Sequence, residues 1–266
     1  SGASSGSLTT ASTKRELSIN AMSTAAREPT GGAKSQPQPG QTWENTLGQK
    51  FVPVPETGVL FCIWETRVQD FAEFAQATGS GWPKSGEPVH PAVNVSWIDA
   101  QAFCAWLTQK EQAAGHLRPH QKYRLPTDAE WSLAVGLGNE RSGSPESKSK
   151  DSQTRGLYPW GTQWPPPTGA GNYDPIMKVD SYDGTAPVGS FAANRHGIYD
   201  LGGNVWEFCD DFYNGRDGKR VLRGMSWGSF NADLLRSSNR GLSEPDDRGG
   251  NKGFRVVVEV GGASSF

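Results

Sequence analysis

Apolar and polar positions alternate along several short segments of the chain, a pattern typical of half-buried strands. The alternation runs over residues 51–55 and 59–64, which flank a turn at residues 56–58, and together they predict a hairpin. Further short strands are expected near Ile198 and over residues 205–207, 221–222 and 253–260.

Three segments carry helical spacing instead. Residues 68–78 have an apolar stripe and are followed by Gly79, a residue that commonly ends a helix. A second helix is expected over about residues 96–114. A third begins at Thr127, because Thr127 and Glu130 have the spacing of a capping box.

Polar, irregular stretches separate these elements. Residues 1–40 are rich in Ser, Thr, Ala, Gly, Pro and Gln, and such a segment buries too little apolar surface to offset its ordering entropy. We therefore predict a tail or linker over residues 1–40 and one folded domain over residues 41–262. Residues 138–155 are polar and predict a solvent loop. Residues 158–194 pass through turn after turn, and irregular segments this long are usually functional or held by ions.

The composition fits a loop-rich domain and narrows the classes of partner. The chain has 33 glycines, 18 prolines and ten tryptophans, and the tryptophans supply large side chains for a core. The formal net charge of −2 gives no sign of the clustered basic face that nucleic acid requires. No apolar run approaches the ~20 residues that span a bilayer. The chain begins with Ser1 and lacks an apolar leader, so we expect a processed chain, one domain of a longer protein, or both.

The cysteines, Cys62, Cys104 and Cys209, are too widely spaced for a disulfide framework or a zinc site. We interpret them as three small buried side chains. One disulfide with one free thiol is the alternative.

Seven segments, in the same order, resemble the sulfatase-modifying-factor family, to which formylglycine-generating enzymes belong. They are residues 64–68, 90–97, 123–131, 158–161, 197–207, 222–227 and 253–257. The resemblance covers about residues 43–260. It implies an α+β, irregular, loop-rich C-type-lectin-like fold with a few helices and short antiparallel strands.

The segment from Asp200 to Glu207 offers two carboxylates and several main-chain carbonyl groups, the oxygen ligands that calcium prefers. The resemblance implies a calcium ion held by the side chains of Asp200 and Glu207 and by the carbonyl groups of Gly203 and Val205. The family usually has Asn at the position of Asp200, and a carboxylate there should tighten the site.

The resemblance implies a second calcium ion, held by the side chains of Asn172 and Asp180 and the carbonyl groups of Tyr173 and Tyr182. The alternative is that these are turn residues that bind local amides without metal. We therefore expect one or two structural calcium ions that clamp the loops.

The chemistry of the family is not expected here. Its enzymes oxidise a substrate cysteine with copper and two cysteines of their own, because soft thiolates select Cu(I). The matching positions hold Ser229 and Leu234, and the last cysteine of the chain is Cys209. We therefore expect no copper and no formylglycine formation. The family's iron enzymes carry a histidine-rich site, and the four histidines here do not have that grouping.

One alternative enzyme activity comes from residues 224–228, which read Gly-x-Ser-x-Gly and match the nucleophile elbow of hydrolases. In an esterase of this kind Ser226 would be the nucleophile and His196 a candidate base. The elbow requires a strand before the serine and a helix after it.

The loops around residues 227–251 have the polar and aromatic composition of a recognition surface. The candidate contact residues are Trp227, Ser229, Asn231, Arg236 and Arg240. Similar domains serve as variable ligand-binding proteins, and others are appended to bacterial kinases. The alternative is that the arginines pair with nearby carboxylates and brace the loops.

Three classes of function therefore stay open. The first is a non-catalytic module that binds an unknown protein or small-molecule ligand. The second is an enzyme of different chemistry, which a deep polar pocket near Ser226, Ser229 and His196 would favour. The third is an assembling subunit, a homo-oligomer formed through the N-terminal tail. No nucleic-acid partner and no membrane span are expected, and calcium sites favour an extracytoplasmic or secreted protein.

Overall fold

The computed structural model describes residues 36–261 apart from residues 85, 139, 141–149 and 216–217. Most of the predicted tail, residues 1–35, therefore lies outside the described residues. Residues 36–40 already contact the domain, since Pro37 is buried and its carbonyl oxygen accepts a hydrogen bond from Gln121 Nε2 at 3.0 Å. The folded part begins a few residues earlier than the predicted position 41.

The strands form two small sheets. In the first, β1 (Trp43–Glu44), β2 (Lys50–Pro53), β3 (Val59–Cys62), β9 (Val257–Glu259) and β4 (Lys122–Arg124) lie antiparallel in that spatial order. In the second, the order is β7 (Gly241–Ser243), β6 (Arg220–Arg223), β5 (Trp206–Phe212) and β8 (Lys252–Gly253). Only the pair of β5 and β8 is parallel among these pairings. The predicted α+β, loop-rich architecture is confirmed.

The three predicted helices form where their local signals place them. Helix α1 (Val68–Thr78) ends at Gly79, which adopts φ 70°. Helix α2 (Trp97–Ala113) follows Ser96, whose side chain accepts the Asp99 amide at 3.1 Å. Helix α3 (Asp128–Val135) has the predicted capping box, in which the Thr127 and Glu130 side chains each accept the other's amide.

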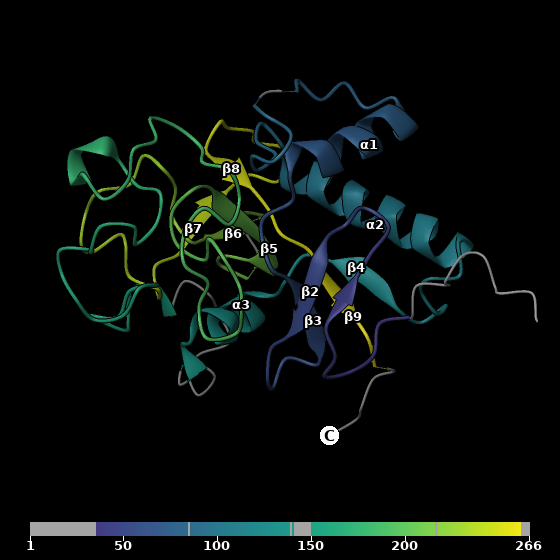
Figure 1. Ribbon diagram of the computed structural model, residues 1–266, viewed down its shortest axis with the longest axis horizontal. Coiled ribbons are helices and arrows are strands. Elements are labelled where there is room, and N and C mark those ends of the chain that lie inside the picture. The colour runs from purple at the N-terminus through teal and green to yellow at the C-terminus, as the bar shows by residue number, and fades with distance from the viewer. Residues whose placement is uncertain (1–35, 85, 139, 141–149, 216–217, 262–266) are drawn as a thin grey trace, which may run out of the picture. The chain divides into compact units, whose positions relative to one another are not determined.

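The first sheet and the two longer helices enclose the main core. Figure 1 shows α1 and α2 side by side against this sheet. Aromatic side chains of the two helices contact one another. Phe71 of α1 stacks on Phe103 of α2 with ring centroids 5.7 Å apart. The same cluster includes Leu60 of β3 and Val258 of β9. None of the described helices is long and apolar enough to cross a membrane.

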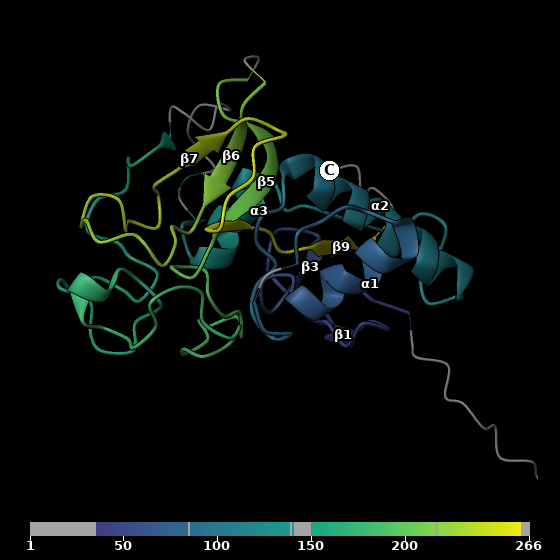
Figure 2. The same ribbon diagram turned by 90° about the horizontal axis from the view of Figure 1, so that it is seen from above.

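The long loops lie on the far side of the second sheet from α1 and α2, as Figure 2 shows. Residues 158–194 follow the predicted succession of turns, with one short 3₁₀ helix at Pro175–Met177. They have a small core of their own that includes Tyr158, Tyr173 and Met225. With so little regular structure, these loops depend on side-chain packing to hold them.

Two predicted strands differ from the structure. Ile198 lies outside the strands, directly after a turn at residues 195–196, and the Asn194 side-chain oxygen accepts the amides of His196 and Ile198 there. The predicted strand over residues 253–260 is two strands, β8 and β9, in different sheets. Arg255 lies between β8 and β9, and its buried guanidinium holds the chain where it passes from the second sheet to the first.

The cysteines are free and buried, which confirms the sequence interpretation. Burial raises the pKa of the Cys62 thiol to about 12 and raises the pKa values of Cys104 and Cys209 as well. All three therefore stay protonated thiols at neutral pH.

Candidate functional site

A tight turn leads into β5 and brings the two sets of predicted calcium ligands together. Asp200, Gly203 and Asn204 all adopt left-handed backbone angles, with φ between 56° and 84°. A Cβ atom on Gly203 would lie 2.3 Å from the Asn172 carbonyl oxygen, so only glycine fits at this position. The Asn204 amide donates to the same carbonyl at 2.9 Å. The segments 200–207 and 172–173 are therefore in direct contact.

The first set, which we call the first site, is Asp200, Gly203, Val205 and Glu207. The Asp200 carboxylate is buried, and burial raises its pKa to about 6 despite a 2.7 Å hydrogen bond from the Gly189 amide. The Glu207 carboxylate is fully buried and accepts hydrogen bonds from Arg255 Nε, Arg255 Nη2 and Trp131 Nε1. A carboxylate has about four lone-pair positions, so the three donors leave Glu207 able to bind one further cation.

Glu65 is a functional candidate that the sequence reasoning missed. It is fully buried, and its carboxylate accepts hydrogen bonds from Asn204 Nδ2 at 2.8 Å and the Val205 amide at 3.4 Å. Burial raises its pKa, and the negative charges of Asp200 and Glu207 raise it further. The sequence did offer one signal for Glu65, since its carboxylate stands in the short segment between the apolar strand β3 and helix α1.

The charge balance around the first site fits a divalent cation. Three buried carboxylates, Glu65, Asp200 and Glu207, face one buried guanidinium, Arg255, which gives a net charge of −2 when all four are ionised. The described residues contain no group of three or more His, Cys, Asp or Glu that converges on a metal position. Glu65 contacts the first set through hydrogen bonds from Asn204 Nδ2 and the Val205 amide.

The second set, which we call the second site, is Asn172, Tyr173, Asp180 and Tyr182. The two Asp180 carboxylate oxygens accept the amides of Tyr173 and Tyr182, each at 2.9 Å, and so fix both peptide segments. Asn172 Nδ2 donates to the Gly184 carbonyl at 2.8 Å and to Asn204 Oδ1 at 3.2 Å. Asn172 Oδ1 is buried without a hydrogen-bond partner. This buried acceptor belongs to the residue before Tyr173, whose amide Asp180 binds, and a calcium ion there would complete its contacts.

The positions of the family's cysteine pair lie on a different part of the loops. Ser229 is buried, its Oγ accepts the Ser226 amide at 3.3 Å, and its carbonyl accepts the Asp174 amide at 3.1 Å. Leu234 is 46% exposed and Phe230 is 53% exposed. The Asp174 amide links its segment to Ser229, and Ile176, two residues after Asp174, is 71% exposed. We call Ile176, Phe230 and Leu234 the apolar patch.

The other predicted surface residues divide into loop contacts and interior residues. Trp227 is half-buried, with its indole nitrogen 3.3 Å from the Gly250 carbonyl oxygen, and Asn231 is exposed, with its side chain accepting the Asp233 amide. Arg236 forms an ion pair with Asp233. Trp227, Asn231 and Arg236 are thus close in sequence to Phe230 and Leu234 of the apolar patch.

Arg240 does not lie on the predicted binding surface. Its guanidinium is buried, 3.1 Å from both Asp128 carboxylate oxygens and 2.7 Å from Glu140. The prediction rested on the composition of residues 227–251, which does not reveal a pairing with residues 100 and 112 positions away. Arg240 braces loops, as the alternative interpretation expected, although its partners come from α3 and its vicinity.

The same network changes the interpretation of the predicted solvent loop at residues 138–155. Residues 139 and 141–149 lie outside the described residues. Asp151 in the described end accepts the Arg240 amide at 2.9 Å and the Tyr213 hydroxyl at 3.1 Å. This end of the loop is tied to the domain.

The serine-hydrolase arrangement has no support in the described residues. Strand β6 precedes the Gly224–Gly228 segment, but turns rather than a helix follow it. Ser226 is buried with its Oγ 3.5 Å from Asn251 Nδ2, and no hydrogen bond within the described residues joins it to His196. His196 instead accepts from Arg195 Nε at 3.1 Å.

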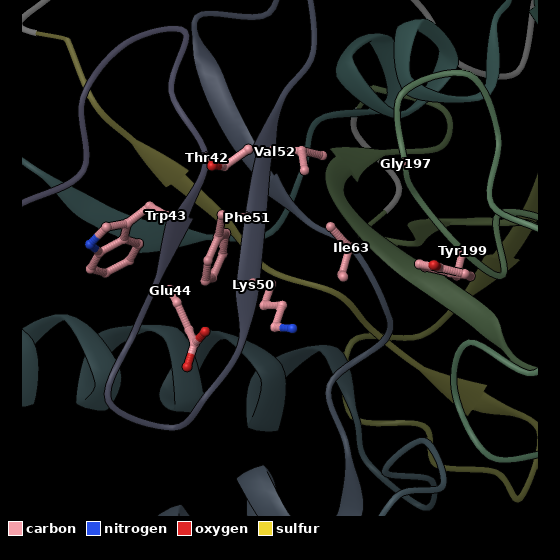
Figure 3. A pocket seen from close by; sticks show the side chains of 9 residues that line it. All are labelled: Thr42, Trp43, Glu44, Lys50, Phe51, Val52, Ile63, Gly197 and Tyr199. Atoms are coloured by element: carbon pink, nitrogen blue, oxygen red, sulfur yellow. The ribbon is translucent and has the colours of Figure 1, made fainter. Parts of the chain in front are cut away.

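Two clefts among the described residues also lie elsewhere. Figure 3 shows an open cleft of about 550 Å³ where β1 and β2 face the loop of Gly197 and Tyr199. A second cleft of about 500 Å³ is lined by loop residues that include Trp160, Phe191 and Asp200. Neither is lined by Ser226, Ser229 or His196.

Comparison with known proteins agrees with the fold and the motifs. Residues 32–260 match the family described as "Sulfatase-modifying factor enzyme 1-like domain". The formylglycine-generating enzyme of Streptomyces coelicolor is 30% identical over 215 residues, which is 71% of this chain and 59% of that protein. The inactive C-alpha-formylglycine-generating enzyme 2 of Bos taurus is 34% identical over 182 residues, which is 64% of this chain and 51% of that protein. The chain thus spans between half and three-fifths of these relatives' lengths.

A solved structure shares the fold. PvdO from Pseudomonas aeruginosa superposes with a TM-score of 0.60 at 23% identity, covering 84% of this chain and 99% of that one. The family match extends over nearly all the described residues and begins before the predicted domain boundary. The chain belongs to the sulfatase-modifying-factor family.

Proposed function

We propose that this chain is a non-catalytic member of its family, a binding module whose loops are clamped by structural calcium. The observation that carries the proposal is the pair of residues at the cysteine positions. Ser229 and Leu234 stand there, and Leu234 has no atom that binds a metal. The copper chemistry of the family needs both thiolates.

The remaining cysteines offer no replacement. All three are buried in the hydrophobic clusters, two in the main core and one in the cluster beneath β5 and β6. Their raised pKa values keep them protonated, and a protonated thiol is a poor ligand for Cu(I). A bovine relative whose name describes it as inactive supports the idea that the fold persists without the reaction.

Calcium is the cofactor that the two sites favour. Both sets consist only of oxygen atoms, from carboxylates, one amide and main-chain carbonyl groups, as a hard cation requires. The two buried carboxyl side chains of the first site, Asp200 and Glu207, and the unpartnered Asn172 Oδ1 at the second support an ion at each. The ions would replace the hydrogen-bonded strands that residues 158–205 lack.

The apolar patch and its neighbours are the proposed binding face. Phe230 and Leu234 expose large apolar side chains where an active enzyme would hold its copper. Trp227 and Asn231 add an aromatic ring and an amide beside them. Contacts of this type, aromatic or aliphatic anchors within a polar border, provide most of the free energy of binding in protein interfaces.

Two assays on one protein preparation test this proposal. In the first, the copper-treated chain and the Streptomyces coelicolor enzyme receive the same cysteine peptide, and only the latter should form an aldehyde. In the second, peptide and glycan arrays identify ligands of the wild-type chain. Phe230→Ser with Leu234→Ser should weaken such ligands by roughly thirty-fold or more, since two anchors are lost.

Ile98→Ser is the matched control for the array, because Ile98 is as exposed as Phe230 but lies on α2. It should leave every ligand bound. Aldehyde formation by this chain would contradict the non-catalytic assignment. Ligands that bind the double variant as tightly as the wild type would show that the binding face lies elsewhere.

A further inference from the structure

Asn204 lies between the two calcium sites and contacts both. It follows Gly203 and precedes Val205, the two carbonyl ligands of the first site. Its side-chain Oδ1 accepts Asn172 Nδ2 of the second site at 3.2 Å and the Ala186 amide at 2.9 Å. Its Nδ2 donates to Glu65 at 2.8 Å. No other arrangement of the Asn204 amide satisfies these three partners, so its orientation is fixed.

These bonds form one continuous path. It runs from the side-chain amide of Asn172 to the side-chain amide of Asn204 and then to the Glu65 carboxylate. From there it continues to the main-chain N–H of Val205. A second, parallel link is the hydrogen bond from the main-chain N–H of Asn204 to the main-chain carbonyl of Asn172. Every step is buried, so water does not compete for these groups.

The path ends on ligand groups at both sites. At the second site, the two donations from Asn172 Nδ2 leave Asn172 Oδ1 as the free acceptor. At the first site, the hydrogen bond from Val205 to Glu65 orients the main chain that carries the Gly203 and Val205 carbonyl groups. Ordering one end of the path therefore orders the ligands at the other.

We propose that Asn204 couples the two calcium sites, so that an ion at either site increases the affinity of the other. This inference rests on the proposed binding of calcium. The cost of ordering Asn204 and its neighbours is met when the first ion binds, and the second ion binds a framework already in place. Couplings of this kind typically change affinity by roughly five-fold to a hundred-fold, and they act equally in both directions.

Calcium titrations of the chelator-treated chain by isothermal calorimetry test the coupling. The wild type should bind two ions with positive cooperativity. Asp180→Asn should remove the second site and weaken the first by roughly five-fold or more, although Asp180 is no ligand of the first site. In Asn204→Gly, which keeps a residue suited to φ 57°, adding Asp180→Asn should leave the first-site affinity unchanged.

Asn94→Gly is the matched control, because Asn94 also adopts a left-handed conformation, with φ 56°. It should keep the cooperativity of the wild type. Circular dichroism verifies that each variant is folded, and Asn204→Ser, which loses the donor to Glu65, replaces Asn204→Gly if the glycine variant unfolds.

The outcomes separate the two proposals. A wild-type chain that binds no calcium overturns the calcium proposal and the coupling with it. Two ions that bind independently, or an equal effect of Asp180→Asn with and without the Asn204 side chain, overturn the coupling alone.

Discussion

Arg255→Ala is expected to lower the free energy of unfolding by about 3–5 kcal/mol, a large part of the protein's stability. Arg255 is fully buried and binds the Glu207 carboxylate through Nε at 2.7 Å and Nη2 at 2.5 Å. It also donates to the carbonyl groups of Tyr199 and Asp200, at 2.9 and 3.3 Å. Removing it leaves the buried Glu207 carboxylate without its guanidinium partner, in a region that already holds Glu65 and Asp200.

Thermal unfolding followed by circular dichroism measures this effect. For a domain of this size the expected loss corresponds to a fall in Tm of roughly 10 °C or more. Lys252→Ala is the control, because Lys252 pairs with Asp247, whose side chain is half exposed, and such pairs contribute less than about 1 kcal/mol. A Tm for Arg255→Ala within about 2 °C of the wild type would show that the buried pair is not a main support of the fold.

Asp128→Ala is expected to cost a similar amount, about 3–5 kcal/mol, for a related reason. The buried Asp128 carboxylate forms ion pairs with two buried arginines, Arg223 and Arg240. Glu140, which binds Arg240 at 2.7 Å, then remains as the partner carboxylate in this network. Two guanidinium groups would share one carboxylate in the protein interior.

Urea denaturation measures the stability of this variant, and limited proteolysis shows where it opens. Because Arg240 binds Asp151 and the Lys150 carbonyl, new cleavage is expected near residues 150–155. Asp99→Ala is the control, since Asp99 also stands in the first turn of a helix but pairs with the half-exposed Arg248. It should lose about 1 kcal/mol. Equal effects of the two substitutions would contradict the structural role of the buried network.

The parts of the fold that depend on neighbouring residues could be predicted from the sequence. Helix α1 ends at Gly79 and α3 begins after Thr127 as expected, because caps are local signals that act within three or four residues. The hairpin of β2 and β3 follows from alternation around one turn in the same way. The cysteines were placed inside because apolar environments suit a small thiol.

The features that sequence reasoning missed depend on distant residues. Arg240 is buried because Asp128 and Glu140 arrive from about a hundred positions away, and no local pattern reveals them. The strand expected over residues 253–260 divides because Arg255 must reach Glu207 in the second sheet. Glu65 lies beside the first site because Asn204 and Val205, 139 and 140 positions away, donate hydrogen bonds to its carboxylate.

Metal analysis of the purified chain, paired with melting curves, tests most directly whether the fold is clamped by calcium and free of copper. Two calcium ions per chain are predicted, together with a fall in Tm of roughly 5 °C or more when a chelator is added, because an ion that binds only the folded state stabilises it. Stoichiometric copper, iron or zinc would contradict the account and give priority to an enzyme. A chain without calcium whose melting curve does not respond to the chelator would contradict the clamped loops.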